Sequence, residues 1–543
     1  MQSHEKARLT IGFAVALPCL IIGCAAPQKA EPVPPQEVTG RIGSRKQREQ
    51  LFDWIVSRTM QREAFSAPKN RALNLDVKQA MLACRDDVVE ARSEHELIVA
   101  LHQLSCARRD RHLKIELVPW GLKADCPNAN ADVPLRFAAD FENMNAPFCF
   151  VSDLPVNNAP EGVEIGDRVI EVNGQAFRDW KRSISPYLRS STDIGLWWEL
   201  ARALSRRSRF WPAELNPDRA RYKLRKPGGK TLEIDVELVE NIRNFKWMVE
   251  SKSPYPGWRT LLDLKTFTLY APRRGPEVLL IAWHAFKEEL IDDLNTLVKY
   301  AQRRNWLDRP LIIDCTTSRG GSLSPHALQR LFPKPFRTTF CNVRISDAIP
   351  LLIANIRREI KDRAATGAGF PRAMGDGSWL VEWLEMDVEP AIARGDEYSN
   401  EVPFKLAHLP RNSKGFLFPI KPHFRGRAIV LLGPHGGSQL DQFASIIVDN
   451  SLATTIGMPT GGYSNTWEHK ENLFLPGTAQ QLVRFMWSIG HTIRPNGEVL
   501  EGNPANVDEW IPVTQKNSPV YRQMLVQRAL KLLDLPAVTL SSK

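Results

Sequence analysis

The stretch Leu431–Asn450, "LLGPHGGSQLDQFASIIVDN", places a serine between a short apolar strand and a helix. After Ser438, apolar residues recur at helical spacing, at Leu440, Phe443, Ile447 and Val448. A serine at a helix start can be a cap, and Ser438 with Asp441 fits the S-x-x-D capping pattern. The same position exposes the hydroxyl at the carboxyl end of a strand, where a base can activate it as a nucleophile. From these residues alone, Ser438 can be a cap, a nucleophile or both.

Two Gly-rich segments, "DCTTSRGG" and "GPHGGS", follow runs that we expect to be strands. Ligands of α/β sheets bind beyond the carboxyl ends of the strands. The backbone N–H of Gln439 and that of Gly320 or Gly321 are candidate donors to an oxyanion, and the helix N-terminus favours the same negative charge. A tight turn from strand to helix is the alternative explanation of the glycines.

His112 lies in "RRDRHLKIE", between a helix end and a strand-like run. From such a loop a side chain can reach a cleft, although a surface histidine in a basic run is the alternative. His435 in "GPHGGS", three residues before Ser438, is close enough in sequence to act as a base, but we expect it to line the cleft instead. His284, in the strand-like "LLIAWHAF", is interpreted as a core residue.

Hydrophobic periodicity divides the chain into regions. Residues 44–132 are expected to be mainly helical and to carry His112, with a capping box at Ser93 and Glu96. Short strands with turn signals follow over 133–240, interrupted by a Trp- and Arg-rich helical insertion at about 179–212. After a connector (241–275), strands and helices alternate over 276–535, which predicts an α/β domain with a mainly parallel sheet. An insert at about 346–424 is either a lid or a substrate-binding element.

The N-terminus "MQSHEKARLTIGFAVALPCLIIGCAAP" has a charged start and an apolar stretch too short for a comfortable membrane span. Its end resembles the lipobox of bacterial lipoproteins, which implies a signal peptide over 1–23 and lipidation of Cys24. Residues 24–43 then form a Pro-rich tether. Because Ala25 rather than aspartate follows, we expect an outer-membrane lipoprotein that faces the periplasm. An ordinary secretory signal with an incidental cysteine is the alternative.

The composition limits the kinds of partner and cofactor that the protein is expected to bind. The 543 residues are 43% hydrophobic, enough for a large core, and the formal net charge of +11 is spread along the chain. Without a nucleic-acid-binding pattern beside that charge, we expect no nucleic acid, and an anionic envelope surface explains the balance. The six cysteines after Cys24 fit no zinc motif, and neither metal nor cofactor is expected. They are either buried thiols or include the pairs Cys84/Cys106 and Cys126/Cys149.

The segment "PEGVEIGDRVIEVNGQAF" resembles the PDZ domains of bacterial proteases. Gly162, Gly166 and Asp167 stand where that pattern has its glycines and aspartate. The resemblance implies that 133–240 binds a peptide by adding a strand to a sheet edge. A purely structural hairpin is the alternative.

The order of features along the chain resembles the tail-specific, or carboxy-terminal processing, serine peptidase family. It consists of a helical part, a PDZ-like domain, "LIIDxxxxxGGS", then "GGSxxxxFASIIVDNxxATxIGxPTGG", then "EGNPANVDEWIPVT". The resemblance implies a multidomain α/β protein with a crotonase-like peptidase domain. In that family the serine stands at a helix start eleven residues before the aspartate of a "DN" or "DY" pair, and counting back from Asp449 gives Ser438.

One branch of the family pairs this serine with a lysine, whose place here is taken by Tyr463. The tricorn-like branch uses an upstream histidine and a tail glutamate, which correspond to His112 and to Glu501, seven residues before Asp508. Arg111 replaces the small residue that usually precedes the histidine, and Val507 replaces a proline in the tail. Because of these departures, a catalytically degenerate member of the family remains an alternative.

The resemblance therefore implies an envelope serine peptidase that cleaves unstructured protein or peptide tails by acyl transfer. Ser438 would be the nucleophile, His112 the base and Glu501 the orienting acid. The main alternative is a catalytically degenerate peptide-binding lipoprotein on the same scaffold, and a weaker one is a hydrolase of non-peptide esters. The oligomeric state is not predicted.

Overall fold

The computed structural model describes residues 41–126, 129, 131–240, 242–250, 253–367, 369, 377–404, 414–464 and 467–538. The expected signal peptide and lipidated Cys24 therefore lie outside the described residues. Within the described ranges, no helix has both the length and the apolar character needed to cross a membrane.

The N-terminal part is helical, as predicted, and consists of α1 (Arg45–Arg62), α2 (Ala67–Ala72), α3 (Val77–Leu82), α4 (Arg85–Val89) and α5 (Glu94–Cys106). The hydroxyl of Ser93 accepts the backbone N–H of Glu96 and caps α5. After α5 the chain forms β1 (Ile115–Glu116), which pairs with β21 (Gln481–Ser488), and β21 pairs with β20 (Glu468–Phe474). The N-terminal helices thus share one body with a hairpin from the far end of the chain.

Residues 133–240, which resemble PDZ domains in sequence and are called the PDZ-like region below, form a β-sheet with helices. The sheet has the order β2-β3-β4-β6-β7, with β5 on β4. The strands are β2 (Arg136–Asp140), β3 (Phe148–Asp153), β4 (Arg168–Val172), β5 (Gln175–Ala176), β6 (Arg219–Arg225) and β7 (Thr231–Glu237). Between β5 and β6 lie α6 (Phe177–Ile184) and α7 (Asp193–Leu204), as the predicted helical insertion requires. Leu200 of α7 is fully buried against this sheet.

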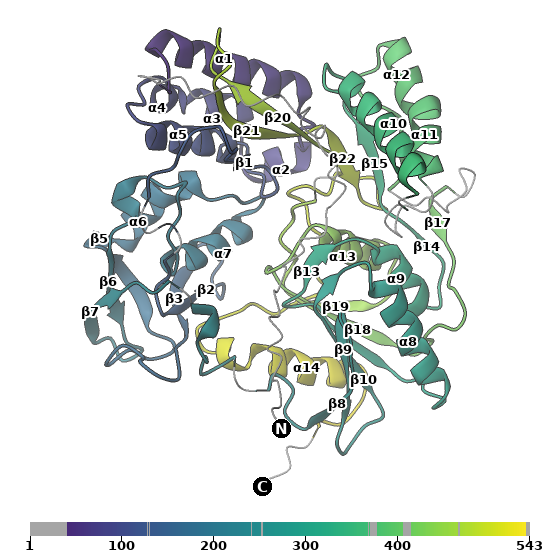
Figure 1. The fold of residues 1–543 in the computed structure, drawn as a ribbon. Coiled ribbons are helices and arrows are strands. Elements are labelled where there is room, and N and C mark those ends of the chain that lie inside the picture. Colours follow the sequence, from purple (N-terminus) through teal and green to yellow (C-terminus); the bar gives the residue numbers. More distant parts are fainter. Residues whose placement is uncertain are drawn as a thin grey trace, which may run out of the picture.

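The largest sheet lies in the region that we expect to be the peptidase domain and is called the peptidase-like sheet. It is mainly parallel, as predicted, and has the order β23-β19-β18-β12-β10-β9-β8; Figure 1 labels β8, β9, β10, β18 and β19. Four neighbouring pairs are parallel, joining β10 (Leu279–Trp283), β12 (Leu311–Asp314), β18 (Ala428–Leu432), β19 (Thr454–Gly457) and β23 (Glu509–Trp510). The antiparallel edge is made by β9 (Phe267–Pro272) and β8 (Trp258–Asp263), which fall in the segment that we expected to be a connector.

Helices cover both faces of this sheet. One face packs against α8 (Leu290–Gln302), α9 (Ser324–Leu331) and α13 (Gln439–Asp449), and the other against α14 (Tyr521–Leu532). The central strands β10, β12 and β18 are buried along their whole length, as expected for a parallel sheet in an α/β domain. Small strands flank this layer, namely β11 (Ala285–Phe286), β13 (Arg319–Gly321), β14 (Phe336–Arg337), β15 (Phe340–Val343) and β22 (Gly490–Ile493).

The insert at 346–424 contains α10 (Ile349–Thr366), α11 (Ser378–Trp383), a π-helical turn (Leu384–Val388), α12 (Glu389–Arg394), β16 (Val402–Pro403) and β17 (Phe416–Leu417). Ile356 and Leu384 are buried in the same core cluster as Phe52 and Leu101 of the N-terminal helices. In Figure 1, α10–α12 stand beside β15 and β22, on the far side of the β20–β21 hairpin from α1. The insert therefore packs with the N-terminal body rather than only with the peptidase-like sheet.

The cysteines form neither of the two pairs considered from the sequence. Cys84 and Cys106 are buried free thiols, and so is Cys149, the proposed partner of Cys126. Burial raises the pKa of the Cys84 and Cys106 thiols to about 12, which keeps them protonated and unreactive at neutral pH.

Candidate active site

Ser438 lies at the turn between β18 and α13, as the sequence pattern predicts. Its backbone has φ 61° and ψ −122°, in the positive-φ region that non-glycine residues rarely adopt. The N–H of Ser438 donates to the carbonyl of Tyr463 at 2.6 Å and to Oδ2 of Asp441 at 2.8 Å. The surroundings thus hold a strained backbone at the start of a helix, a type of strain that is often found at functional sites.

Asp441 joins the start of α13 to the loop that follows β19. Its side chain is fully buried, and besides Ser438 it accepts the N–H groups of Gly462 and Tyr463, each at 2.9 Å. Burial raises the pKa of Asp441 to about 7, although these three backbone hydrogen bonds oppose the rise. The sequence analysis had assigned Asp441 only to the capping pattern.

Of the two glycine candidates for the oxyanion hole, Gly320 lies closer to Ser438. A Cβ atom on Gly320 would lie 2.7 Å from the carbonyl oxygen of Gly437, 2.8 Å from Cβ of Ser438 and 3.3 Å from the nitrogen of Gln439. Only glycine allows β13 to come so near the nucleophile candidate. Gly321 has φ 146° and instead packs on the backbone of Phe286 in β11. The backbones of Gly320 and Gln439 therefore adjoin each other beside Ser438.

His112 reaches the same site from the N-terminal body. Its ring meets the ring of Tyr463 edge-on, with 5.1 Å between the ring centroids. Asp110 fixes the backbone here, because its Oδ1 accepts the N–H groups of His112 and Leu113 at 2.9 and 3.3 Å. Tyr463 thus contacts both candidates: its carbonyl accepts from Ser438 and its ring packs on His112.

Burial lowers the pKa of His112, so the ring is neutral near pH 7, the state that a general base requires. The carboxylates that act most strongly against this shift are Glu468 and Asp110, while Arg111 adds to it. Sequence analysis identified neither carboxylate. Asp110 is visible in "RRDRH", but Glu468 is brought in by the β20–β21 hairpin and has no sequence signal.

Glu501 contacts the loop that carries Tyr463 and is only 3% exposed. Its Oε2 accepts the N–H of Ser464, the residue after Tyr463, at 2.8 Å. In the part of the chain that the structure describes, Oε1 accepts no hydrogen bond. Burial raises the pKa of Glu501 to about 8, and the nearby charge of Asp110 adds to this effect. Glu501 is therefore largely protonated at neutral pH.

The rival bases are less suited to the role. Burial lowers the pKa of His435 to about 4, and the ring packs edge-on against Trp198 of α7 with 5.5 Å between the centroids. Burial raises the pKa of Tyr463, so its phenol stays protonated. The interpretation of His284 as a core residue is wrong. The residue is exposed, because it directly follows β10, which ends at Trp283.

The PDZ-like residues form a turn that packs on the peptidase-like domain. Gly162 and Gly166 have φ values of 73° and 99°, which favour glycine. The carboxylate of Asp167 is buried, accepts the N–H of Glu164 at 2.9 Å and pairs with Lys226 at 3.0 Å. The carbonyl of Gly166 accepts a hydrogen bond from the side chain of Gln515. Asp167 therefore holds the turn together.

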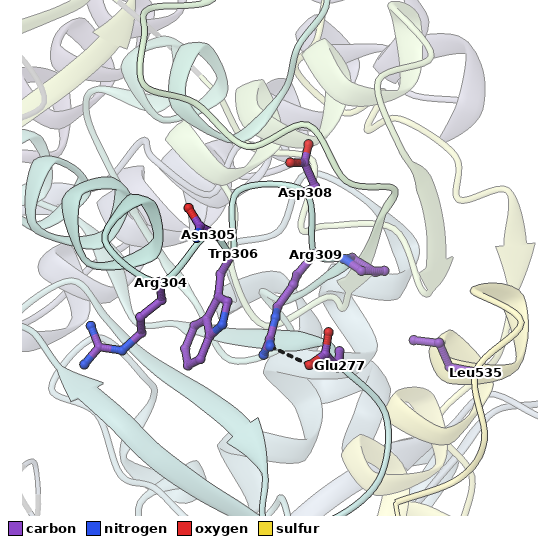
Figure 2. Close-up of a pocket in the computed structure, with 8 residues that line it drawn as sticks. Glu277, Arg304, Asn305, Trp306, Asp308, Arg309 and Leu535 are labelled. Atoms are coloured by element: carbon purple, nitrogen blue, oxygen red, sulfur yellow. Dashed lines mark hydrogen bonds and ion pairs between the residues drawn. The ribbon is translucent and has the colours of Figure 1, made fainter.

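A pocket of about 550 Å³ lies elsewhere on the peptidase-like domain, beside Trp306, Arg309 and Glu277 (Figure 2). Arg309 lies over the Trp306 ring, 4.2 Å from its centroid, and pairs with Glu277 at 2.8 Å. Glu277 and Pro310 precede β10 and β12, so the pocket adjoins the amino ends of these strands. Ser438 lies beyond the carboxyl end of β18, so this pocket is not part of the candidate active site. No group of three or more His, Cys, Asp or Glu side chains in the described ranges could hold a metal ion.

No family model and no curated protein matches the chain. Among solved structures, mature CPAF complexed with lactacystin is similar over 90% of this chain and 99% of its own, with 14% identity and a TM-score of 0.66. Mature CPAF alone gives a TM-score of 0.65 at 14% identity, covering 92% and 99% of the two chains. The photosystem II D1 C-terminal processing protease is less similar, with a TM-score of 0.39 at 11% identity over 88% and 96% of the chains. The expected multidomain α/β architecture is confirmed, and over nine-tenths of its length the chain has the fold of mature CPAF.

Proposed function

We propose that this protein is a serine peptidase that cleaves unstructured protein or peptide tails. One observation carries the proposal. The strained backbone of Ser438 is hydrogen-bonded to the carbonyl of Tyr463, and the ring of Tyr463 packs against His112. A nucleophile at a helix start and a neutral histidine from a distant part of the chain thus meet at one residue.

In this proposal Oγ of Ser438 attacks the carbonyl carbon of the scissile peptide bond, and its proton passes to His112. The N–H groups of Gln439 and Gly320, with Gly321 as the second choice, donate to the oxyanion that forms. The intermediate collapses, the C–N bond breaks and His112 returns the proton to the leaving amine. Water then attacks the acyl-enzyme, again with His112 as base, and the hydroxyl of Ser438 is regenerated.

Glu501 is assigned the supporting role, since a nearby negative charge stabilises the imidazolium that forms during each attack. Its pKa of about 8 means that the supporting charge is mostly absent at neutral pH. The carboxylates of Asp110 and Glu468 both favour the charged form of His112, so they stabilise the imidazolium when Glu501 is protonated.

We further propose that the tail binds the PDZ-like region, at the sheet edge served by the turn with Gly162, Gly166 and Asp167. Lipidation of Cys24 would hold the enzyme at the envelope, where the Pro-rich tether lets the globular part reach its substrates. The resemblance of both segments to known signals supports these two steps.

The test is covalent labelling of the purified protein with a fluorophosphonate, followed by peptide mapping. We expect a single adduct on Ser438 in the wild type and none in Ser438→Ala. Ser451→Ala, which changes an exposed serine just past the same helix, is the matched control and should label normally. Absence of an adduct in the folded wild type would contradict the peptidase proposal.

A peptide-binding lipoprotein without catalysis is the second candidate, and Arg111 is the observation that favours it. Its guanidinium lies 4.6 Å from the centroid of the Tyr463 ring, and one of its nitrogens lies 2.5 Å from the carboxylate of Glu199. A large charged side chain therefore stands beside the proposed base. Binding of a tailed protein together with absence of the Ser438 adduct would establish this second function.

A further inference from the structure

The helical insertion of the PDZ-like region contacts the loop that carries His112. The backbone N–H of Arg111 donates to Oγ of Ser191 at 3.1 Å. The guanidinium of Arg189 donates to the carbonyl of Arg111 at 3.2 Å. These two hydrogen bonds hold the peptide units on both sides of Arg111, directly before His112.

More contacts extend this attachment in both directions. Arg109 donates to the carbonyl of Thr192 at 3.4 Å and pairs with Asp193 at 3.2 Å. The hydroxyl of Thr192 in turn donates to the carbonyl of Gly461 at 3.4 Å, in the loop that precedes Tyr463. The insertion thus touches both loops that meet beside Ser438.

Within this attachment, Ser191 has a special place. Its side chain is only 1% exposed, so water cannot replace its interactions. Its Oγ accepts the N–H of Arg111, the residue directly before His112. One buried hydroxyl of the PDZ-like region therefore fixes the backbone beside the proposed base.

We propose that Ser191, from the PDZ-like region, is a positioning residue of the active site that holds the loop carrying His112 in place. The proposal rests on the proposed function, and it assigns part of the catalytic geometry to a domain that would otherwise serve only for recognition. Ser191 needs no contact with substrate for this role. A shift of about 1 Å in a catalytic group can cost roughly 100-fold in rate, so one buried hydrogen bond is sufficient.

The experiment compares Ser191→Ala with Ser190→Ala, using the rate constant of fluorophosphonate labelling at Ser438. Ser190 is equally buried, and in the described part of the chain its hydroxyl has no hydrogen-bond partner, so it is a matched control. A small reagent does not use the peptide-binding edge, so recognition of tails does not enter the measurement. We expect labelling to be about 10- to 100-fold slower in Ser191→Ala and unchanged in Ser190→Ala.

Ser191→Thr distinguishes positioning from a general loss of structure. It retains the hydroxyl that accepts the N–H of Arg111, so its labelling rate should stay close to that of the wild type. A rate in Ser191→Ala equal to that of the wild type, or a slower rate that Ser191→Thr does not restore, would overturn the proposal.

Ser191→Cys covers the case in which the alanine variant does not fold. It nearly preserves the volume but replaces the hydroxyl with a weaker hydrogen-bonding group, so labelling should again be slower than in the wild type. A wild type that is not labelled at all would instead refute the proposed function, so the two failures are distinguishable.

Discussion

The carboxylate of Asp441 fixes the backbone of Ser438: its Oδ2 accepts the N–H of Ser438 at 2.8 Å and that of Tyr463 at 2.9 Å. The same side chain takes a third N–H, from Gly462, through Oδ1. One buried group thus holds the nucleophile candidate and the residue that packs on His112 in a fixed relation.

Replacing Asp441 with alanine leaves the N–H groups of Gly462 and Tyr463 buried without acceptors, while the N–H of Ser438 keeps the carbonyl of Tyr463. At about 1–3 kcal/mol for each unsatisfied group, we expect the free energy of unfolding to fall by about 2 kcal/mol or more. Urea denaturation measures this loss, and labelling of Ser438 should slow in the same variant. Asp534→Ala, at an exposed position near the C-terminus, is the control. A loss below about 1 kcal/mol would show that the loop finds other acceptors.

His112 and Ser438 should behave as one catalytic unit. We expect His112→Ala to lower peptide hydrolysis about 10⁴-fold or more, roughly as much as Ser438→Ala, and the double variant to be little worse than either. Turnover of an unstructured peptide by the three variants measures this. Near-normal activity of His112→Ala would move the search for a base to His435 or Tyr463.

The activity should rise with pH through the pKa of Glu501. His112 is already neutral near pH 7, whereas the pKa of Glu501 is raised to about 8 by burial. If the carboxylate supports the imidazolium, the rate should increase with an apparent pKa near 8. Glu501→Gln should abolish this increase of the rate with pH. It should also lower the maximal rate, but by less than His112→Ala lowers it. A single limb with a pKa below 6.5 would assign the titration to His112 instead.

The same shift makes a prediction about stability. The pKa of Glu501 is about 8 in the folded protein against an ordinary value of 4.5, so the folded state binds the proton more tightly. Its contribution is fully present below pH 4.5 and is lost as the pH rises to about 8. Glu501→Gln should therefore raise Tm at pH 8 relative to the wild type, and by more than at pH 5. Equal changes in Tm at both pH values would contradict the buried, protonated state.

The expected lipid anchor can be tested without the structure. Replacing Cys24 with serine should release the protein from the membrane fraction into the soluble envelope fraction, because the thiol is the site of lipid attachment. Cys19→Ser, in the same apolar stretch, is the matched control and should leave fractionation unchanged. Membrane association that survives Cys24→Ser would favour an ordinary secretory signal and another means of attachment.

Local patterns in the sequence were sufficient for the elements that carry the site. The turn before α13, the helices of residues 44–106 and the parallel strands depend on neighbouring residues, through capping, periodicity and β-branched runs. Ser438 and Gly320 could be identified for the same reason, since each lies in the segment that follows a core strand, β18 or β12. Val448 shows the limit, because it follows the helical period but lies at the half-exposed end of α13.

The sequence by itself determined the strand-to-helix turn at Ser438 and indicated His112 only through a resemblance. The tertiary structure alone decided that His112 lies against Tyr463, that Glu468 acts on it and that Ser191 reaches its loop. These residues come from separate parts of the chain. Their contacts arise from the packing of one domain on another, which no local pattern encodes. Propensity acts over a few residues, whereas the geometry of this site is set by burial between distant segments.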